Sequence, residues 1–140
     1  MNYGKIVRLS AVYDLIVTFP FAFPKLCELQ VEFLRRLHAQ LHLTGSIPDF
    51  FPIHYFFINL MGSLVVVWSN LRIKHPEAVL GLFDSFARIL FSGLMIYYLT
   101  VYKVTGLLWF LFFPEITWAA VQLYGYMNYR KSAPTKMTLK

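Results

Sequence analysis

The residues of this sequence most able to do chemistry are charged side chains inside apolar runs. In "GLFDSFARILF", residues 81–91, Asp84 and Arg88 lie one helical turn apart, the spacing at which side chains of a helix contact each other. Asp14 and Glu115 lie within two further apolar stretches. Charged groups in such surroundings are typical of proton-linked or ion-linked sites, of polar anchors for a ligand headgroup, or of ion pairs that fix the register of helices.

The composition indicates that lipid, and not water, surrounds most of the chain. Of its 140 residues, 58% are hydrophobic and 14% are charged, and the mean hydropathy is +0.55, far from the average of soluble proteins. The formal net charge is +6, yet the basic residues stand at the edges of apolar blocks, as they do beside membrane helices. The sequence therefore predicts one membrane domain and argues against a nucleic-acid partner.

Four apolar blocks predict membrane-spanning helices at about residues 7–24, 50–70, 76–101 and 105–128. Each block can cover a hydrocarbon core ~30 Å thick at ~1.5 Å per residue. We expect an all-α integral membrane four-helix bundle that forms a single transmembrane domain over residues 1–140, with a basic C-terminal tail at 129–140. The short connection "YKVTG" between the last two blocks predicts an antiparallel hairpin.

The segment at about residues 25–43 has a different pattern. Apolar residues recur there at spacings of three or four, while charged residues occupy the other faces. The apolar positions are Leu26, Leu29, Phe33, Leu37 and Leu41. This pattern predicts an additional amphipathic helix between the first two spans, lying at the membrane interface.

The distribution of Lys and Arg predicts the orientation in the membrane. With four spans, eight basic residues fall on one side and four on the other, and the richer side is normally cytoplasmic. The eight are Lys5, Arg8, Arg72, Lys74, Arg130, Lys131, Lys136 and Lys140, and the four are Lys25, Arg35, Arg36 and Lys103. We therefore expect both termini in the cytoplasm, the amphipathic helix on the outer face, and a bacterial inner membrane as the location.

Counting along the expected helices places the buried charges at matching depths. Arg88 and Glu115 each lie ~20 Å from the cytoplasmic edge, and Asp14, Asp84 and Gln122 lie ~10–13 Å from it. A charge at mid-bilayer costs at least ~2.5–3.5 kcal/mol, so we expect Arg88 to pair with Glu115 of the neighbouring span. The predicted polar seam consists of Asp14, Asn59, Asp84, Arg88, Glu115 and Gln122, provided that Asn59 faces inward. Three acids against one arginine leave two carboxyl groups without a cationic partner.

The remaining candidate ligands give weaker signals. His38 and His42 form an i,i+4 pair and His54 follows at the same outer face, but the glutamate of a zincin is missing, so we predict interfacial polar residues and no metal site. Cys27 is the single cysteine, which excludes a multi-cysteine zinc site or an iron–sulfur cluster built from this chain alone. The sequence contains no phosphate-binding glycine loop and no nucleophile elbow. No cofactor is predicted, and a quinone or a lipid stays open as a ligand of the seam.

The chain resembles the small four-helix bacterial inner-membrane proteins that are broadly DoxX-like. The stretches that carry the resemblance are "YDLIVTFPFAFP" (13–24), "INLMGSLVVVWSNLRIKHPE" (58–77), "FDSFARILF" (83–91) and "PEITWAAVQL" (114–123). Some DoxX-like members are associated with quinone-linked oxidation, so the resemblance implies Arg88 and Glu115 as polar contacts in a quinone or lipid pocket. Asp14 and the amphipathic segment depart from the family's pattern, and no family active site is carried over.

Three functions are compatible with these features, and we favour the first. It is a non-enzymatic accessory or interaction protein that joins itself or a larger membrane complex among the membrane lipids, with the seam fixing helix register. The second is a proton-linked carrier or binding protein for a small or amphipathic molecule, and the third is a quinone-handling subunit of a membrane oxidoreductase. A cavity that reaches Arg88 favours the carrier, whereas close side-chain packing around a sealed pair favours the accessory protein.

Overall fold

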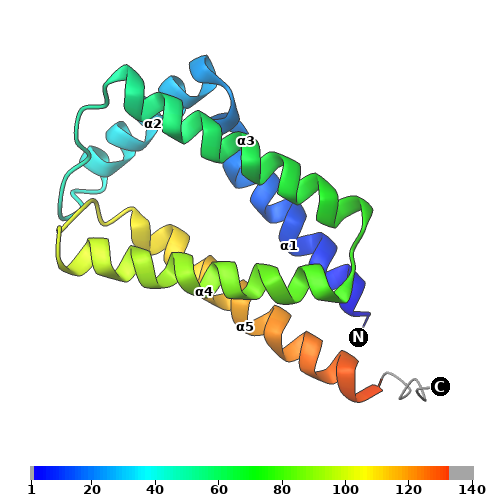
Figure 1. Ribbon diagram of the computed structural model, residues 1–140. Coiled ribbons are helices and arrows are strands. Elements are labelled where there is room, and N and C mark those ends of the chain that lie inside the picture. Colours follow the sequence, from blue (N-terminus) through cyan, green and yellow to red (C-terminus); the bar gives the residue numbers. More distant parts are fainter. Residues whose placement is uncertain (1, 133–140) are drawn as a thin grey trace.

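The computed structural model describes residues 2–132; residue 1 and residues 133–140, which include Lys136 and Lys140 of the predicted basic tail, lie outside the described part. Within that part the chain is all-helical, as predicted, and consists of five α-helices and one 3-10 helix (Figure 1). They are α1 (Tyr3–Thr18), η1 (Phe19–Ala22), α2 (Pro24–Gln40), α3 (Pro52–Lys74), α4 (Ala78–Thr100) and α5 (Leu108–Ser132). The first residues of the predicted tail, 129–132, continue α5.

Two of these helices, α3 and α4, are each 23 residues long and apolar enough to cross a membrane. The segment from α1 to α2 has the length and composition of a third span, but it bends by 104° between η1 and α2. The helix α5 has 25 residues, and Pro114, Glu115 and Gln122 interrupt its apolar sequence. The structure therefore contains two helices fit to span a membrane and gives the other predicted segments a helical form.

Proline residues cause the break between α1 and α2. Pro20 has no N–H group, and its ring clashes with the carbonyl group of the preceding turn, so α1 ends at Thr18 and the chain continues as the 3-10 turn η1. Pro24 then occupies the first turn of α2, where a missing N–H group is tolerated. The helix predicted over residues 7–24 therefore ends earlier, at Thr18. It also begins earlier than predicted, at Tyr3.

Polar side chains of α3 bond the carbonyl groups that this break leaves free. Asn59 Nδ2 donates to the carbonyl of Phe21 (2.9 Å), and Ser63 Oγ donates to that of Ala22 (3.5 Å). Backbone groups in an apolar environment need such partners. Contrary to the prediction, the structure places Asn59 at this bend and not in the polar seam.

The helices form two antiparallel pairs that meet at α1. One pair is α4 with α5, as the short connection predicts, and in the other α3 packs against α1 and η1. The helix α1 also contacts α4 and α5, so it lies between its partner α3 and the pair formed by α4 and α5 (Figure 1). The helices α3 and α4 follow each other in sequence but belong to different pairs. Long polar side chains connect them, such as that of Trp68, whose indole N–H donates to Asp84 (2.9 Å).

Two loops tie the pairs together at one end, which we call the loop end. The loop before α3 and the loop before α5 meet in a parallel bridge between Ser46 and Val104, and His38 Nδ1 lies 2.8 Å from the hydroxyl of Thr105. Gly45 has a φ of +83°, and a Cβ atom there would collide with the carbonyl groups of residues 103 and 104. Only glycine fits this position without strain.

The opposite end, where α1 begins and α5 ends, is the terminal end and holds a small apolar core. Its buried members are Tyr3, Ile6 and Val7, with Ala78, Trp118 and Tyr126 packed against them. The side chain of Tyr3 fits between Gly81 of α4 and Gly125 of α5, where a Cβ atom would come within 2.5 Å and 2.8 Å of it. Two glycines thus let α1 approach both helices of the other pair.

The helix α2 carries the amphipathic pattern predicted for residues 25–43. Cys27 and Val31 are buried against the rest of the protein, while Leu26, Leu29 and Phe33 are exposed. An apolar helix face that no protein element covers fits a position in the membrane interface.

Gly62 provides a test of how closely α3 approaches the break between α1 and α2. A Cβ atom at Gly62 would come within 2.5–2.6 Å of backbone atoms of Phe21 and Ala22, whereas one at Gly93 of α4 would meet nothing within 4 Å. We expect Gly62→Ala to lower the free energy of unfolding by about 1–3 kcal/mol, because backbone atoms cannot move aside as a flexible side chain does. Gly93→Ala should be neutral or stabilising by up to about 1 kcal/mol, since alanine is the better helix former. Reversible unfolding in detergent micelles measures both, and equal losses at the two positions would contradict this packing.

Candidate functional site

Arg88 is the centre of a buried network of ion pairs. Its side chain is 1% exposed. Its Nε donates to Asp84 Oδ2, one turn earlier on α4 (2.9 Å), and its Nη1 donates to Glu115 Oε2 of α5 (2.8 Å). Its Nη2 donates to both carboxylate oxygens of Asp14 on α1 (2.6 and 2.7 Å). The structure thus contains the pairing of Arg88 with Glu115 that depth counting predicts, and all three guanidinium nitrogens are occupied.

A second arginine, Arg72 of α3, completes the network. Its side chain is 0% exposed, and it contacts Asp14 Oδ2 and Asp84 Oδ2, each at 2.5 Å. The guanidinium also lies over the ring of Trp68, 5.4 Å from the ring centroid, in a cation–π arrangement. The position of Arg72 at the end of an apolar block predicts a residue that flanks a membrane helix, and the structure shows it inside the protein instead. Its long side chain reaches inward from the end of α3 because two carboxylates lie within its range.

The buried position of Arg72 changes the basis of the predicted orientation. A guanidinium paired inside the protein does not mark a membrane surface, because it contacts neither headgroups nor water. Without Arg72, the balance of basic residues becomes seven against four in place of eight against four. The excess on the side of the termini is smaller but keeps its sign.

Gln122 and Ser10 connect the network to the backbone of α1. The amide nitrogen of Gln122 donates to Asp84 Oδ2 (2.9 Å) and to Ser10 Oγ (2.6 Å). Ser10 Oγ in turn donates to the carbonyl of Val7 (3.0 Å) and accepts from Arg72 Nη1 (3.4 Å). The predicted seam residues Asp14, Asp84, Arg88, Glu115 and Gln122 are therefore all brought together.

The network contains one more cation than the sequence predicts, so its positive and negative charges are closer to balance. Two guanidinium groups face three carboxyl groups, so one carboxyl group, and not two, exceeds the number of cations. Glu115 is bonded to Arg88 alone, whereas Asp14 and Asp84 each contact both arginines. The side chain of Glu115 is also the most exposed of the three acids, at 15% against 12% for Asp14 and 5% for Asp84. The surplus carboxyl group thus lies at the edge of the network.

Small residues allow four helices to converge on these charges. Those that are buried on the facing surfaces are Ser10, Ala11, Ser69, Ser85, Ser92 and Ala119. On α4 the buried positions recur every three or four residues, and they include both Asp84 and Arg88. Close approach of backbones through small side chains is typical of helix packing in membranes. On α3 the neighbouring buried position Ser69 and the indole of Trp68 are the local signal that Arg72 faces inward.

The predicted histidine candidates do not come together. His38 bonds with Thr105, and His54 Nδ1 accepts from the backbone N–H of Phe51 (3.0 Å). His42 lies exposed in the turn after α2. Within residues 2–132, no group of three or more His, Cys, Asp or Glu side chains has an arrangement that could hold a metal ion.

Two surface cavities open away from the ion-pair network. One, of about 540 Å³, lies at the terminal end between the starts of α1 and α4. The other, of about 430 Å³, lies between the starts of α2 and α3, beside Asn59. Neither is lined by Arg72, Arg88 or one of their carboxylate partners. Protein side chains therefore enclose both arginines.

The geometry suits the network to holding helices together. The guanidinium groups, which would polarise a substrate if they were free, already donate to carboxylates. The carboxylates of Asp14 and Asp84 likewise accept from several donors. The groups of the network that stay unused are the surplus carboxyl group, Arg72 Nε and the amide oxygen of Gln122, and the last two are buried without a partner among the described residues.

Comparison with known proteins yields no similarity: no protein-family model, no curated protein sequence and no solved structure matches this chain.

Removal of Arg88 tests how far the network supports the fold. Arg88→Leu leaves three carboxyl groups with Arg72 as their one cation, and we expect a loss of about 3–5 kcal/mol in the free energy of unfolding because a buried charge remains uncompensated. The double change Arg88→Leu, Glu115→Leu removes both partners of one ion pair and should destabilise the protein less than Arg88→Leu alone. Unfolding of both variants in the same detergent gives the comparison, and equal losses would argue against coupling.

The three acids should differ in how much they stabilise the protein. Glu115→Gln keeps an acceptor for Arg88 and removes the surplus charge, so we expect a change below about 1 kcal/mol. Asp84→Asn keeps one oxygen, so its NH₂ group must face side chains that already donate, either that of Trp68 or those of Arg88 and Gln122, and the change should cost more than about 2 kcal/mol. Thermal unfolding in lipid nanodiscs measures both variants. A larger loss for Glu115→Gln than for Asp84→Asn would contradict the assigned geometry.

Proposed function

We propose that this protein is a small non-enzymatic integral membrane protein that acts as an accessory or interaction subunit. The observation that carries the proposal is the closed state of the ion-pair network, in which Arg72 and Arg88 are 0% and 1% exposed and bonded to residues of the same chain. A network of this kind fixes the packing of helices, and it keeps even Arg72 Nε, the guanidinium nitrogen without a partner among the described residues, buried inside the protein. Interactions with other molecules then take place on the surface.

The network also supports a bundle of four membrane spans. Besides α3 and α4, it includes Asp14 of α1 and Glu115 of α5. Unpaired charges are costly in the hydrocarbon layer of a membrane. Paired charges contributed by four adjacent helices are therefore expected if all four helices lie in that layer. The helix α2, with its exposed leucines, then lies in the membrane interface at the outer end.

The orientation and location that we propose are those that the sequence predicts. The start of α1 and the end of α5 lie at the end of the protein with more basic residues, which we assign to the cytoplasm, and we propose a bacterial inner membrane as the location. The likeness to DoxX-like proteins in "FDSFARILF" and "PEITWAAVQL" agrees with this location.

The apolar exterior supplies the interaction surface. Large aromatic side chains such as Phe86 and Phe91 of α4 and Phe110 and Phe113 of α5 are exposed. Lipid tails can cover these faces, and so can another membrane protein, since helix association in lipid depends on packing and not on hydrophobic burial. The partners we propose are membrane lipids together with further copies of this chain or the subunits of a larger membrane complex.

The surplus carboxyl group supports a second candidate, a proton-linked carrier or binding protein for a small or amphipathic molecule. Glu115 has one cationic partner and is the most exposed acid of the network, so it is the group that could take up and release a proton without dismantling the other pairs. A quinone is the ligand that the DoxX-like resemblance implies, with Glu115 and Arg88 as its polar contacts.

Native mass spectrometry of the full-length protein ejected directly from membranes tests the proposal. We expect a homo-oligomer or a complex with other membrane proteins, with lipids attached and with the same composition in wild type and in Glu115→Gln. A monomer that carries one small molecule in fixed stoichiometry, lost in Glu115→Gln, would instead establish the carrier and overturn the accessory role.

A further inference from the structure

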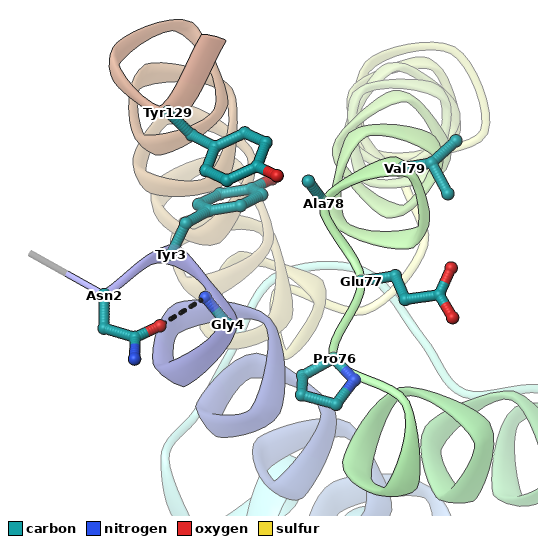
Figure 2. Close-up of a pocket in the computed structure, with 8 residues that line it drawn as sticks. All are labelled: Asn2, Tyr3, Gly4, Pro76, Glu77, Ala78, Val79 and Tyr129. Carbon is teal, nitrogen blue, oxygen red and sulfur yellow. Dashed lines mark hydrogen bonds between the residues drawn. The ribbon is translucent and has the colours of Figure 1, made fainter. Parts of the chain in front are cut away.

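The cavity at the terminal end lies where two helices begin. Its volume is about 540 Å³, and its walls come from the first residues of α1, the first residues of α4 and Tyr129 near the end of α5 (Figure 2). The N-terminus of a helix carries unpaired N–H groups and a partial positive charge. Two such termini therefore face one cavity.

The two helix starts differ in how their N–H groups are used. At the start of α1, the side chain of Asn2 accepts from the backbone N–H of Gly4 (3.1 Å), as the dashed line in Figure 2 shows. At the start of α4, Glu77 occupies the capping position but makes no side-chain hydrogen bond to the helix. No partner within residues 2–132 accepts from the N–H groups of Ala78 and Val79, both of which line the cavity. The start of α4 thus offers unused donors.

The hydroxyl of Tyr3 is a second and independent feature of the cavity. Tyr3 is 5% exposed, and its hydroxyl is buried without a hydrogen-bond partner among the described residues. The ring stacks on Tyr129 with centroids 5.9 Å apart, and both rings extend toward the start of α4 (Figure 2). The hydroxyl reaches the first turn of α4, where a Cβ atom on Gly81 would come within 2.5 Å of it. A buried hydroxyl without a partner costs free energy, so a ligand that accepts its hydrogen bond would remove that cost.

The terminal end as a whole carries more basic than acidic residues, although the one charged residue among residues 2–132 that lines the cavity is the acid Glu77. The basic residues of the terminal end are Lys5, Arg8, Lys74, Arg130 and Lys131, and in the described chain the one acid at this end is Glu77. Glu77 is exposed, and its carboxylate points away from the two tyrosine rings (Figure 2). Helix N–H groups and a phenol donor match the oxygen atoms of a phosphate group, and the basic residues of this end, none of which lines the cavity, would attract an anion toward it.

We propose that this cavity binds the phosphate group of an anionic ligand, supplied either by the headgroup of a membrane lipid or by a soluble phosphate compound. The donors are the N–H groups of Ala78 and Val79 and the hydroxyl of Tyr3. The phosphate lies at the N-terminus of α4, and Glu77 weakens its binding by repulsion. The site is separate from the ion-pair network and goes beyond the accessory role.

Two titrations of the full-length protein in phosphatidylcholine nanodiscs distinguish the sources of phosphate. Native mass spectrometry follows the uptake of phosphatidic acid added to the nanodiscs, and isothermal titration calorimetry follows the binding of inorganic phosphate. Binding of phosphatidic acid alone identifies a lipid headgroup as the ligand, and binding of inorganic phosphate identifies a soluble one; either supports the site if it depends on the residues named below. Absence of binding in both titrations overturns the proposal.

Ala78→Pro removes one donor with little effect on the helix, because proline is favoured at the first helical position and Glu77 already has an extended backbone that tolerates a following proline. We expect it to weaken binding by about tenfold or more, as expected for the loss of a hydrogen bond to a charged group. Ala78→Gly keeps the N–H group and serves as the matched control, with binding expected within about threefold of wild type, because the methyl group that it removes packs against the apolar core and its loss lowers stability and not the number of donors. Equal affinity in Ala78→Pro and Ala78→Gly would overturn the proposal.

Tyr3→Phe separates binding from stability. Because it deletes a buried hydroxyl that has no protein partner, the thermal unfolding temperature should stay the same or rise, while the affinity for phosphate falls by about tenfold. Glu77→Gln alters an exposed side chain, so the fold should persist, and it should tighten binding by about threefold by removing a like charge. Unchanged affinity in both variants would contradict the assigned donors and the role of Glu77.

Discussion

Two guanidinium groups that water does not reach determine how the helices of this protein meet. Arginine stays charged under all ordinary conditions, so its burial is tolerated only where carboxylates and further hydrogen bonds surround it. Arg88 contacts one carboxylate on each of α1, α4 and α5, and Arg72 of α3 contacts two of the same groups. Because these carboxylates belong to three different helices, sliding one helix by a turn would break at least one of the ion pairs. The network therefore specifies the register of the bundle, a task for which its small apolar core offers few contacts.

The position of α1 depends most on these ion pairs, because α1 lies between α3 and the pair formed by α4 and α5. Asp14 joins both arginines, and eleven residues earlier Tyr3 packs against Gly81 and Gly125 of the other pair. These two points hold α1 near both ends of its regular part. Beyond Thr18, Asn59 and Ser63 donate to carbonyl groups that the bend between η1 and α2 leaves without helical partners, so polar groups of α3 stabilise the backbone of the bend. The same helix α3 thus supports α1 by a charge at one end and by neutral donors at the other.

The regular rise of ~1.5 Å per residue predicts the pair of Arg88 with Glu115, which the structure contains. The same count places Asp14, Asp84 and Gln122 at a second, lower level, and it does not predict that Arg88 reaches down to Asp14 and joins the two levels. Counting residues along a helix fails for Arg72. Its Cα lies in the last turn of α3, but its charged group lies deeper in the protein, because a long side chain can reach inward as well as outward. The count also fails for Asn59, because the break at Pro20 creates a demand for donors that periodicity does not show. Side-chain reach and irregular backbone are the two properties that a regular helix count omits.

Because the interior is closed, this protein can bind other molecules on its surface, and the terminal end has the features of a binding site. Of its seven acidic residues, Asp14, Asp84 and Glu115 are bonded inside the protein, and Glu28, Glu32 and Asp49 belong to α2 and the loop after it. Glu77 is therefore the one acid at the terminal end of the described chain, where basic residues are concentrated. That end combines excess positive charge, unused helix N–H groups and an unpartnered hydroxyl on Tyr3. Because Tyr3 also belongs to the apolar core that positions α1, a molecule bound there would contact the same helix that carries Asp14, although the cavity and the network share no residue.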